Sequence, residues 1–433
     1  MAIKRDHQIY KRLISLLAIS GLAGASAPVW SSAFSLNEQN AKDLGTAYAG
    51  AVSSAEDAST GWYNPAGLVR LGQEQIAIAG VYVNSQTTQN ATSATAINNA
   101  PMGAGSAKGK DQLVIPSLHY AKRIDDSWVF ALNIASPFGL KNNFKVTDFN
   151  RYMGTRAEIR TVDIGPSLAY GFNSGFSIGA GVDALYAQAK VDTRVGINNP
   201  ALVPDNFVEN AASNWGVGYH AGVLYEFNDC NTRIGAHYRS KVKIKARGNT
   251  AAAGALIPAP LPTAVRADIT LPESAVLSVY HEFDDQWAIM ADIQWTHWKR
   301  FNELRLRFDN GTQLVTTENF KDSMRYALGV SYQLCEPWKF KVGTAFDRTP
   351  TRDSNRTTAI PDQNRTWAAI GAQYRISSAL VLDFGYAHIF FKKANINQSA
   401  PTAIGTIQSA QSFRGTSKSR ADLIGMQLTW DFV

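Results

Sequence analysis

The stretch WAIMADIQW, from Trp287 to Trp295, decides the fold class of this chain. Successive side chains of a strand alternate between its two faces, so one face here is wholly apolar and carries Trp287, Ile289, Ala291, Ile293 and Trp295. The opposite face tolerates polar groups and carries Ala288, Met290, Asp292 and Gln294. A tryptophan at each end of one apolar face is typical of a strand that crosses a membrane within a β-barrel.

The last ten residues before the C-terminal Val433 repeat this pattern. One face of that strand carries Ile424, Met426, Leu428, Trp430 and Phe432, and the other carries Leu423, Gly425, Gln427, Thr429 and Asp431. From Gln75 onward such stretches recur, separated alternately by tight turns and by longer polar loops. Short connections on one rim and long ones on the other are typical of outer-membrane barrels, with the short side in the periplasm.

The connections give the number of strands. Tight turns are expected at Asp125-Asp126, Asn173–Gly175, Asn228–Asn231, Asp284–Gln286, Cys335–Pro337 and Ser377-Ser378. Long loops are expected near 87–112, 141–155, 198–213, 251–264, 309–322, 349–363 and 398–416. These thirteen connections predict an all-β fold, a 14-stranded antiparallel transmembrane β-barrel over residues 73–433. The loop near 87–112 is polar and of low complexity, so we expect it to be mobile and exposed.

Composition agrees with a membrane barrel. Aromatic residues make up 11% of the chain and charged residues only 18%, and after the N-terminal region no run of about 18 apolar residues occurs that would predict a transmembrane helix. A soluble secreted β-sandwich or propeller is the alternative, but it would not place aromatic residues so regularly at strand ends. The net charge of +7 is modest, and no basic helix or RNA-binding signature suggests a nucleic-acid partner.

The N-terminus predicts export from the cytoplasm. Lys4, Arg5, Lys11 and Arg12 precede the apolar run LISLLAISGLAGASA, which ends at Ala27. This arrangement is that of a signal peptide, assigned to residues 1–31 with cleavage near Ser31 to Ala33. The alternative, a membrane-anchoring helix, is disfavoured because the apolar run is short and is followed by Pro28 and serines.

Residues 32–72 precede the first strand and show no alternation of period two. Residues 40–50 indicate a short helix, and Asp57 to Leu71 a turn set by Pro65 in the sequence Asn64-Pro65-Ala66. A barrel of fourteen strands encloses a water-filled lumen unless something fills it. We therefore expect this segment to be a partly helical hatch that closes the lumen.

Several stretches resemble the long-chain fatty acid transporter family of Gram-negative outer membranes. They are FSLNEQ (34–39), LGTAYAG (44–50), DA…NPA (57–66), 175–190, 214–227, YRSKVKI (238–244), LPE (271–273) with QWAI (286–289), FKD (320–322) and IPDQNRTW (360–367). The resemblance implies a fourteen-strand barrel with a lumenal hatch, capture of hydrophobic substrates at the cell surface, and lateral exit into the membrane through a kinked third strand. It also implies that the ring of Phe34 reaches into the ligand pocket, so that movement of the N-terminus and of the hatch at Asn64, Pro65 and Ala66 acts as a gate. A packed hatch residue is the alternative role for Phe34.

The residues of the third strand support such a kink. This strand is expected from Trp128 to about Leu140 and contains Ser136, Pro137, Phe138 and Gly139. Proline has no backbone N–H to donate, and glycine tolerates conformations that interrupt a ladder. We expect an inward kink at residues 136–139 and a gap in the wall; the alternative is that these residues end the strand.

A fatty acid carboxylate requires a cation or amide partner. The candidate anchors are Arg194, Arg239, Lys241 and Lys243. The alternating lysines also fit a solvated rim that faces lipopolysaccharide. The anchoring positions of the resembled family correspond to Thr193 and Thr316, so the expected cations are displaced or absent.

The sequence carries no catalytic or metal-binding signature: HExxH, CxxC, P-loop and GxSxG patterns are absent. We expect a monomer without cofactors in the outer membrane, with Cys230 and Cys335 as free thiols. The predicted function is passive uptake of long-chain fatty acids. Its rivals are uptake of monoaromatic or other neutral hydrophobic compounds by the same architecture, and a general porin or structural barrel.

Overall fold

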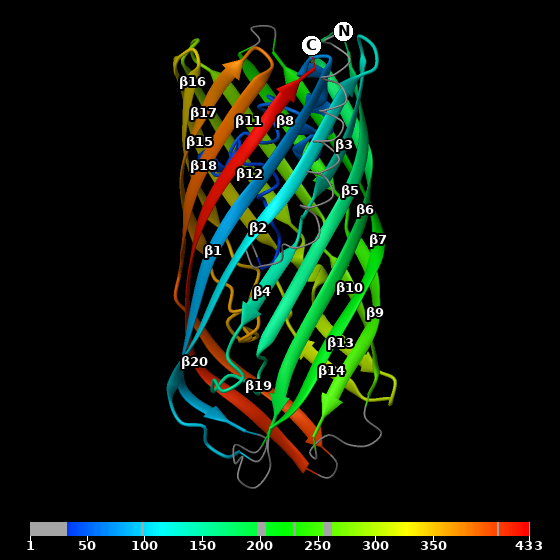
Figure 1. The fold of residues 1–433 in the computed structure, drawn as a ribbon, viewed down its shortest axis with the longest axis vertical. Coiled ribbons are helices and arrows are strands. Elements are labelled where there is room, and N and C mark those ends of the chain that lie inside the picture. Colours follow the sequence, from blue (N-terminus) through cyan, green and yellow to red (C-terminus); the bar gives the residue numbers. More distant parts are fainter. Residues whose placement is uncertain are drawn as a thin grey trace, which may run out of the picture.

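A single antiparallel sheet closes on itself, because β1 (Glu74–Thr95) pairs with both β2 (Gly105–Arg123) and the last strand, β20 (Ile407–Asp431). The computed structural model describes residues 33–96, 99–172, 174–196, 205–227, 231–254, 262–404 and 407–432. Figure 1 shows the resulting barrel with its strands tilted to the long axis. The predicted all-β antiparallel barrel is confirmed.

In the described residues, twenty strand segments make up the fourteen barrel strands, because six of these strands consist of two segments each. The six broken strands are β3 (Trp128–Ala135) with β4 (Gly139–Asn143), β8 (Thr232–Arg239) with β9 (Val242–Ala253), β10 (Ala264–Leu271) with β11 (Ser274–Glu282), β12 (Trp287–Thr296) with β13 (Glu303–Phe308), β14 (Gln313–Thr317) with β15 (Ser323–Cys335), and β18 (Leu380–Phe391) with β19 (Ala394–Ile404). The continuous strands are β1, β2, β5 (Arg156–Gly171), β6 (Phe176–Val195), β7 (Asn206–Glu226), β16 (Trp338–Asp347), β17 (Arg365–Ser377) and β20. A short 3-10 helix, η3 (Trp298–Arg300), lies between β12 and β13.

Burial alternates along the strands as predicted. In β12, Trp287 and Ile293 are exposed on the outer face, whereas Ala288, Met290 and Asp292 are buried toward the lumen. At the rim with the short turns, aromatic rings of neighbouring strands pack together, with centroids 4.4 Å apart for Trp287 and Tyr332 and 4.9 Å apart for Trp128 and Tyr170. This girdle marks one edge of the apolar band.

The loop predicted near 87–112 is wrong. β1 extends to Thr95 and β2 begins at Gly105, and the two strands stay paired out to Ala91 and Gly105. Likewise, β19 and β20 occupy most of the stretch expected to be a loop near 398–416. The physical reason is that strand pairing needs only backbone partners. Beyond the membrane the outer face meets water, so the apolar alternation that marks a strand disappears while the ladder continues.

The residues before β1 fill the lumen as a hatch, which Figure 1 shows in dark blue inside the barrel. It contains a 3-10 turn η1 (Leu44–Thr46), the short helix α2 (Thr60–Tyr63) and the 3-10 helix η2 (Pro65–Arg70). The expected helix over 40–50 is wrong beyond η1, because Ala47 and Tyr48 adopt left-handed conformations with φ of 49° and 61°. Contacts with the barrel wall override the local helix propensity there.

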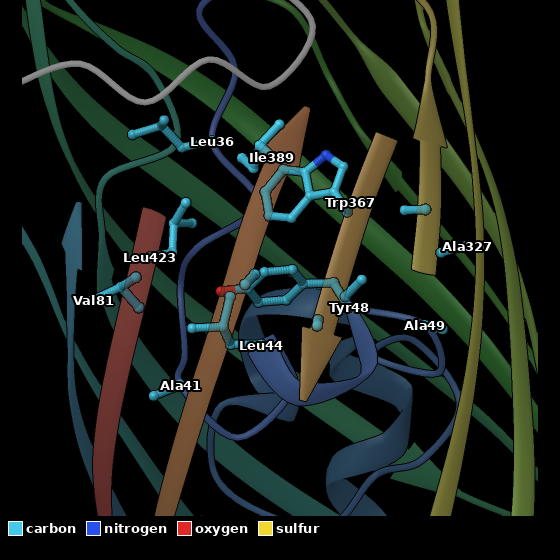
Figure 2. Packing of buried hydrophobic residues seen from close by; sticks show 14 of the residues in the cluster. Leu36, Ala41, Leu44, Tyr48, Ala49, Val81, Ala327, Trp367, Ile389 and Leu423 are labelled. Carbon is cyan, nitrogen blue, oxygen red and sulfur yellow. The ribbon is translucent and has the colours of Figure 1, made fainter. Parts of the chain in front are cut away.

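The hatch packs directly on the wall. Figure 2 shows Leu44 and Tyr48 of the hatch against Trp367, Ile389 and Leu423 of three different strands. One wall position beside η1 is Gly343, where a Cβ atom would collide with the backbone carbonyl of Thr46. Only glycine permits this close approach.

Charged and amide side chains also hold the hatch in the lumen. Lys42 Nζ lies 2.8 Å from Asp43 and 3.5 Å from Glu56, and Glu56 in turn lies 3.3 Å from Lys339 of β16. Gln427 of β20 accepts from the backbone N–H of Ala41 at 3.2 Å. The hatch is therefore fastened by polar contacts as well as by apolar packing.

The predicted signal peptide 1–31 and Cys230 lie outside the described residues, and Cys335 is an exposed free thiol. Among the residues that the structure describes, no helix is long and apolar enough to cross a membrane.

Candidate gate and substrate site

The third strand is interrupted where the sequence predicts a kink. β3 ends at Ala135 and β4 begins at Gly139, and in the described part of the sheet β3 pairs with β2 only from Leu118 to Arg123. β4 continues the ladder with β5 alone. Farther along, Lys141 of β4 and Asp111 of β2 lie 3.8 Å apart as an ion pair across the interruption. The wall between β2 and the third strand thus lacks backbone hydrogen bonds beside residues 136–139.

The N-terminal segment of the hatch supplies partners for this freed backbone. Leu36 N–H donates to the Pro137 carbonyl at 2.8 Å, and Gly139 N–H donates to the Phe34 carbonyl at 2.9 Å. Ser35 and Phe138 form an antiparallel bridge between these two bonds. The hatch therefore adds a short strand to the kink from the lumenal side.

Two side chains complete the pairing. The amide of Gln39 donates from Nε2 to the Ser136 carbonyl and accepts at Oε1 from the Ser136 N–H, both at 2.7 Å. Thr161 Oγ1 accepts from Phe138 N–H at 3.0 Å and donates to the Phe138 carbonyl at 2.6 Å. Gln39 thus pairs both polar backbone groups of Ser136 as a neighbouring strand would.

Phe34 occupies an aromatic cage and is fully buried. Its ring centroid lies 4.6 Å from Trp298, 5.3 Å from Phe301 and 6.1 Å from Phe138. Further apolar side chains surround this cage, among them Leu140, Val242, Ile244, Leu271, Leu306, Phe320 and Ile360. Withdrawal of Phe34 would leave an apolar pocket beside the kink.

A cavity of about 90 Å³ lies next to this cage, between the hatch and the wall. It is lined by Pro137 and Phe138 of the kink, by Trp62 of the hatch, and by Asp183 and Arg239 of the wall. Arg239 forms an ion pair with Asp183, donates to the Trp62 carbonyl at 3.1 Å and stacks on the Trp62 ring at 3.7 Å. The lining of the cavity beside the kink therefore combines apolar and charged groups.

The turn at Asn64, Pro65 and Ala66 is a fastening of the hatch on the wall. Asn64 Oδ1 caps η2 by accepting from Ala66 N–H, and its Nδ2 donates to the carbonyls of Val52 at 2.9 Å and Val223 at 3.0 Å. Ser177 of β6 donates to the Ala66 carbonyl. These residues lie away from the aromatic cage and act in seating the hatch.

The four candidate anchors occupy different places, and the structure brings only Arg239 to the cavity. Lys241 and Lys243 are exposed on the outer face of the barrel, because Val242 and Ile244 take the lumenal positions between them. The Arg194 guanidinium lies 5.4 Å from the Phe207 ring, away from the residues that line the cavity. Thr193 donates to backbone carbonyls of the segment before β5.

Several residues of this site were not predicted. Gln39 and Thr161 pair the kink, and Trp298, Phe301 and Phe320 build the cage, but each is distant from the kink in sequence. The broken ladder is a signal for Gln39 and Thr161 alone, since its polar groups require replacement partners. Among the described residues no group of histidine, cysteine or carboxylate side chains is arranged to hold a metal ion.

Comparison with known proteins identifies the family. The model of the family described as "Outer membrane protein transport protein (OMPP1/FadL/TodX)" matches residues 22–432. A long-chain fatty acid transport protein of Salmonella typhi is 32% identical, covering 89% of this chain and 93% of that protein.

Solved structures share the fold. A FadL homologue of Pseudomonas aeruginosa superimposes with a TM-score of 0.83 at 22% identity, covering 93% of this chain and 100% of that one. The toluene transporter TodX of Pseudomonas putida gives a TM-score of 0.67 at 14% identity, covering 91% and 98%. The chain belongs to the OMPP1/FadL/TodX family of outer membrane transport proteins and resides in the outer membrane.

Proposed function

We propose that the protein mediates passive, ligand-gated uptake of long-chain fatty acids or similar hydrophobic compounds, with lateral exit at residues 136–139. The observation that carries this proposal is the pairing of the N-terminal segment with the kink. Phe34 and the backbone that closes the wall belong to the same short segment, so a ligand that displaces the ring also unpairs the kink. The family and its fatty acid transport relative support the hydrophobic class of substrate.

The route follows from the polarity of the surfaces. A hydrophobic molecule enters at the long-loop rim, which faces the cell surface, and takes the place of Phe34 in the aromatic cage. Movement of residues 34–39 then opens the unpaired wall beside the kink. Lateral exit is favourable because each methylene regains about 0.8 kcal/mol on returning from water to hydrocarbon, whereas release into the periplasm would forfeit that gain.

Arg239 is our candidate for the carboxylate anchor, because it lines the cavity at the kink. Its charge is already balanced by Asp183, and threonines occupy the two family anchoring positions. These two observations favour neutral hydrocarbons as the second candidate substrates, in keeping with the shared fold of the toluene transporter. In this proposal the protein acts as a monomer and catalyses no reaction. Its surroundings in the outer leaflet include lipopolysaccharide.

A reversible crosslink tests the gate. Ser35 and Phe138 form a pair without mutual hydrogen bonds, a geometry in which Cα atoms lie about 4.5 Å apart and a disulfide is accommodated. The variant Ser35→Cys/Phe138→Cys is made in a background with Cys230→Ser and Cys335→Ser. Uptake of labelled oleate and of labelled toluene is measured in cells that lack their own transporter, and heat-modifiable gel mobility confirms folding.

We expect oxidation to abolish uptake and reduction to restore it. Uptake that persists with the disulfide formed contradicts gating by this segment. In the same assay, the variant Arg239→Gln/Asp183→Asn removes both partners of this ion pair. Lower affinity for oleate but not for its neutral alcohol supports Arg239 as the anchor, whereas equal affinity for both assigns the site to neutral compounds.

A further inference from the structure

The outer face of β9, β10 and β13 carries a row of basic side chains that the transport route does not use. The row consists of Lys241 just before β9, Lys243, Lys245 and Arg247 on β9, Arg266 on β10 and Arg307 on β13, and we call it the basic stripe. All six are exposed. The three strands lie side by side in the lower part of the barrel in Figure 1.

Ladder register places these residues close together. Arg247 is paired with Arg266 across β9 and β10, and Arg266 is paired with Arg307 across β10 and β13. Three cations on adjacent strands repel one another unless an anion lies between them. A counter-charge is supplied by Asp268, which lies 2.8 Å from Arg307 and opposite Lys245 in the ladder. The basic stripe therefore has an excess of positive charge.

The stripe begins where the apolar band ends. Trp215, which is exposed on β7, adjoins Gly216, and Gly216 packs against Val242 and the Lys243 carbonyl. Toward the short-turn rim the outer face is apolar, with Val217, Tyr219 and Leu277 all more than half exposed. Toward the long-loop rim it is cationic. The cations thus sit at the depth where lipid headgroups of the outer leaflet lie.

A groove of about 280 Å³ connects the two zones. It is lined by Val217, Tyr219 and Tyr238 on its apolar side and by Lys241, Glu273 and Arg300 at its charged end. Arg300 is paired with Glu273 at 2.8 Å, which leaves Lys241 as the groove's uncompensated cation among the lining residues. An acyl chain fits the apolar side while a phosphate meets the charged end.

The same transition recurs on the opposite side of the barrel. On β2 the exposed residue Val114 gives way to Lys110 and Lys108, and on β20 the exposed residue Ile424 gives way to Arg420 and Lys418. A change from apolar to basic at one level on both sides indicates a boundary set by the membrane and not by one loop.

From these observations we infer that the basic stripe and its groove bind the phosphorylated glycolipid of the outer leaflet, lipopolysaccharide. Its phosphates contact Lys241 at the end of the groove and Lys243, Lys245 and Arg247 along the stripe, and an acyl chain lies in the groove against Tyr219 and Tyr238. Lipopolysaccharide fits because it alone combines several phosphates with acyl chains on the cell-surface side of this membrane. The inference does not depend on which substrate the protein transports.

The test is binding of purified lipid A, measured by native mass spectrometry on delipidated protein in detergent micelles. The variant Lys243→Gln/Lys245→Gln/Arg247→Gln neutralises the stripe on an exposed surface. Each basic residue near an anionic lipid surface contributes roughly a factor of five in affinity, so we expect about a hundredfold weaker binding of doubly phosphorylated lipid A. Phosphate-free lipid A should bind the parent and this variant alike.

Two controls sharpen the result. Lys243→Arg/Lys245→Arg/Arg247→Lys keeps the charges and should keep the affinity, and Lys122→Gln/Arg375→Gln removes exposed cations at the short-turn rim and should leave binding unchanged. Equal affinity of parent and neutralised variant, or equal affinity for lipid A with and without phosphate, overturns the inference. An equal effect of the variant on phosphatidylglycerol binding also overturns it, because the stripe would then be a general anionic-lipid surface. Oleate uptake by the neutralised variant stays at the parent level, so failure here is distinguishable from failure of the transport proposal.

Discussion

Replacing Gln39 by alanine should open the kink while leaving the barrel intact. The side chain of Gln39 makes both hydrogen bonds to the Ser136 peptide at 2.7 Å, and it also donates to the Leu36 carbonyl at 3.3 Å. Alanine removes these bonds and leaves the Ser136 N–H and carbonyl without their partner. The barrel ladders that flank the site do not involve this side chain.

The size of the effect follows from the bonds lost. A hydrogen bond contributes about 1 kcal/mol net, and a partly buried peptide group left unpaired adds to the cost. Loss of the two bonds to Ser136 therefore favours the open segment by about 2–3 kcal/mol, which corresponds to roughly a 30- to 150-fold larger open population.

Amide hydrogen exchange in detergent micelles measures this population directly. The reporters are the N–H groups of Leu36 and Gly139, which bond to backbone carbonyls across the kink and keep these partners in the variant. Their exchange should accelerate by the same factor in Gln39→Ala.

The matched control is Gln427→Ala, which removes another buried lumenal glutamine whose amide holds Ala41 and Lys42. It should accelerate exchange at Ala41 and Lys42 and leave the amides of Leu36 and Gly139 unchanged. If Gln39→Ala leaves the kink amides as slow as in the parent, the hatch does not hold the kink shut.

Two further predictions concern the hatch. Gly343→Val places a side chain against the Thr46 carbonyl and should displace the hatch, so the ion conductance of the barrel in planar bilayers should rise. The control is Gly80→Val, where a Cβ would meet only Val114 on the outer face, and its conductance should stay at the parent level. Parent-level conductance of Gly343→Val would contradict this packing argument. Burial raises the pKa of Glu38 to about 7 from 4.5. Between these two pH values the folded state therefore keeps a proton that the unfolded state loses. The free energy of unfolding should fall by up to about 3 kcal/mol as the pH rises from about 4.5 to 7. In thermal unfolding of Glu38→Gln the decline should be smaller by this amount, and the same pH dependence in parent and variant would refute the assignment.

Local residue patterns were enough to predict the faces of the strands and one strand break from the sequence alone. Alternation over residues 287–295 identified the faces of β12 correctly, because side-chain direction in a strand depends only on position along it. The break between β3 and β4 falls at Pro137, which the sequence singled out because its missing N–H is a property of one residue. The pairing of the extracellular ends of β1 and β2 could not be predicted from the sequence. Beyond the membrane both faces of these strands are polar, although their backbones still pair.

Tertiary structure decided what those elements do. Residues about 100 positions apart, such as Gln39 and Ser136, meet only after the barrel has closed around the hatch, and no periodicity marks their meeting. The same applies to the aromatic cage, which gathers Phe34, Phe138 and Trp298 from three parts of the chain. The alternation of Lys241 and Lys243 could be read from sequence, but only the packing of Val242 and Ile244 against the lumen determined that the lysines face outward. Local chemistry therefore specifies strands and their breaks, whereas closure of the sheet selects which distant groups complete the broken backbone.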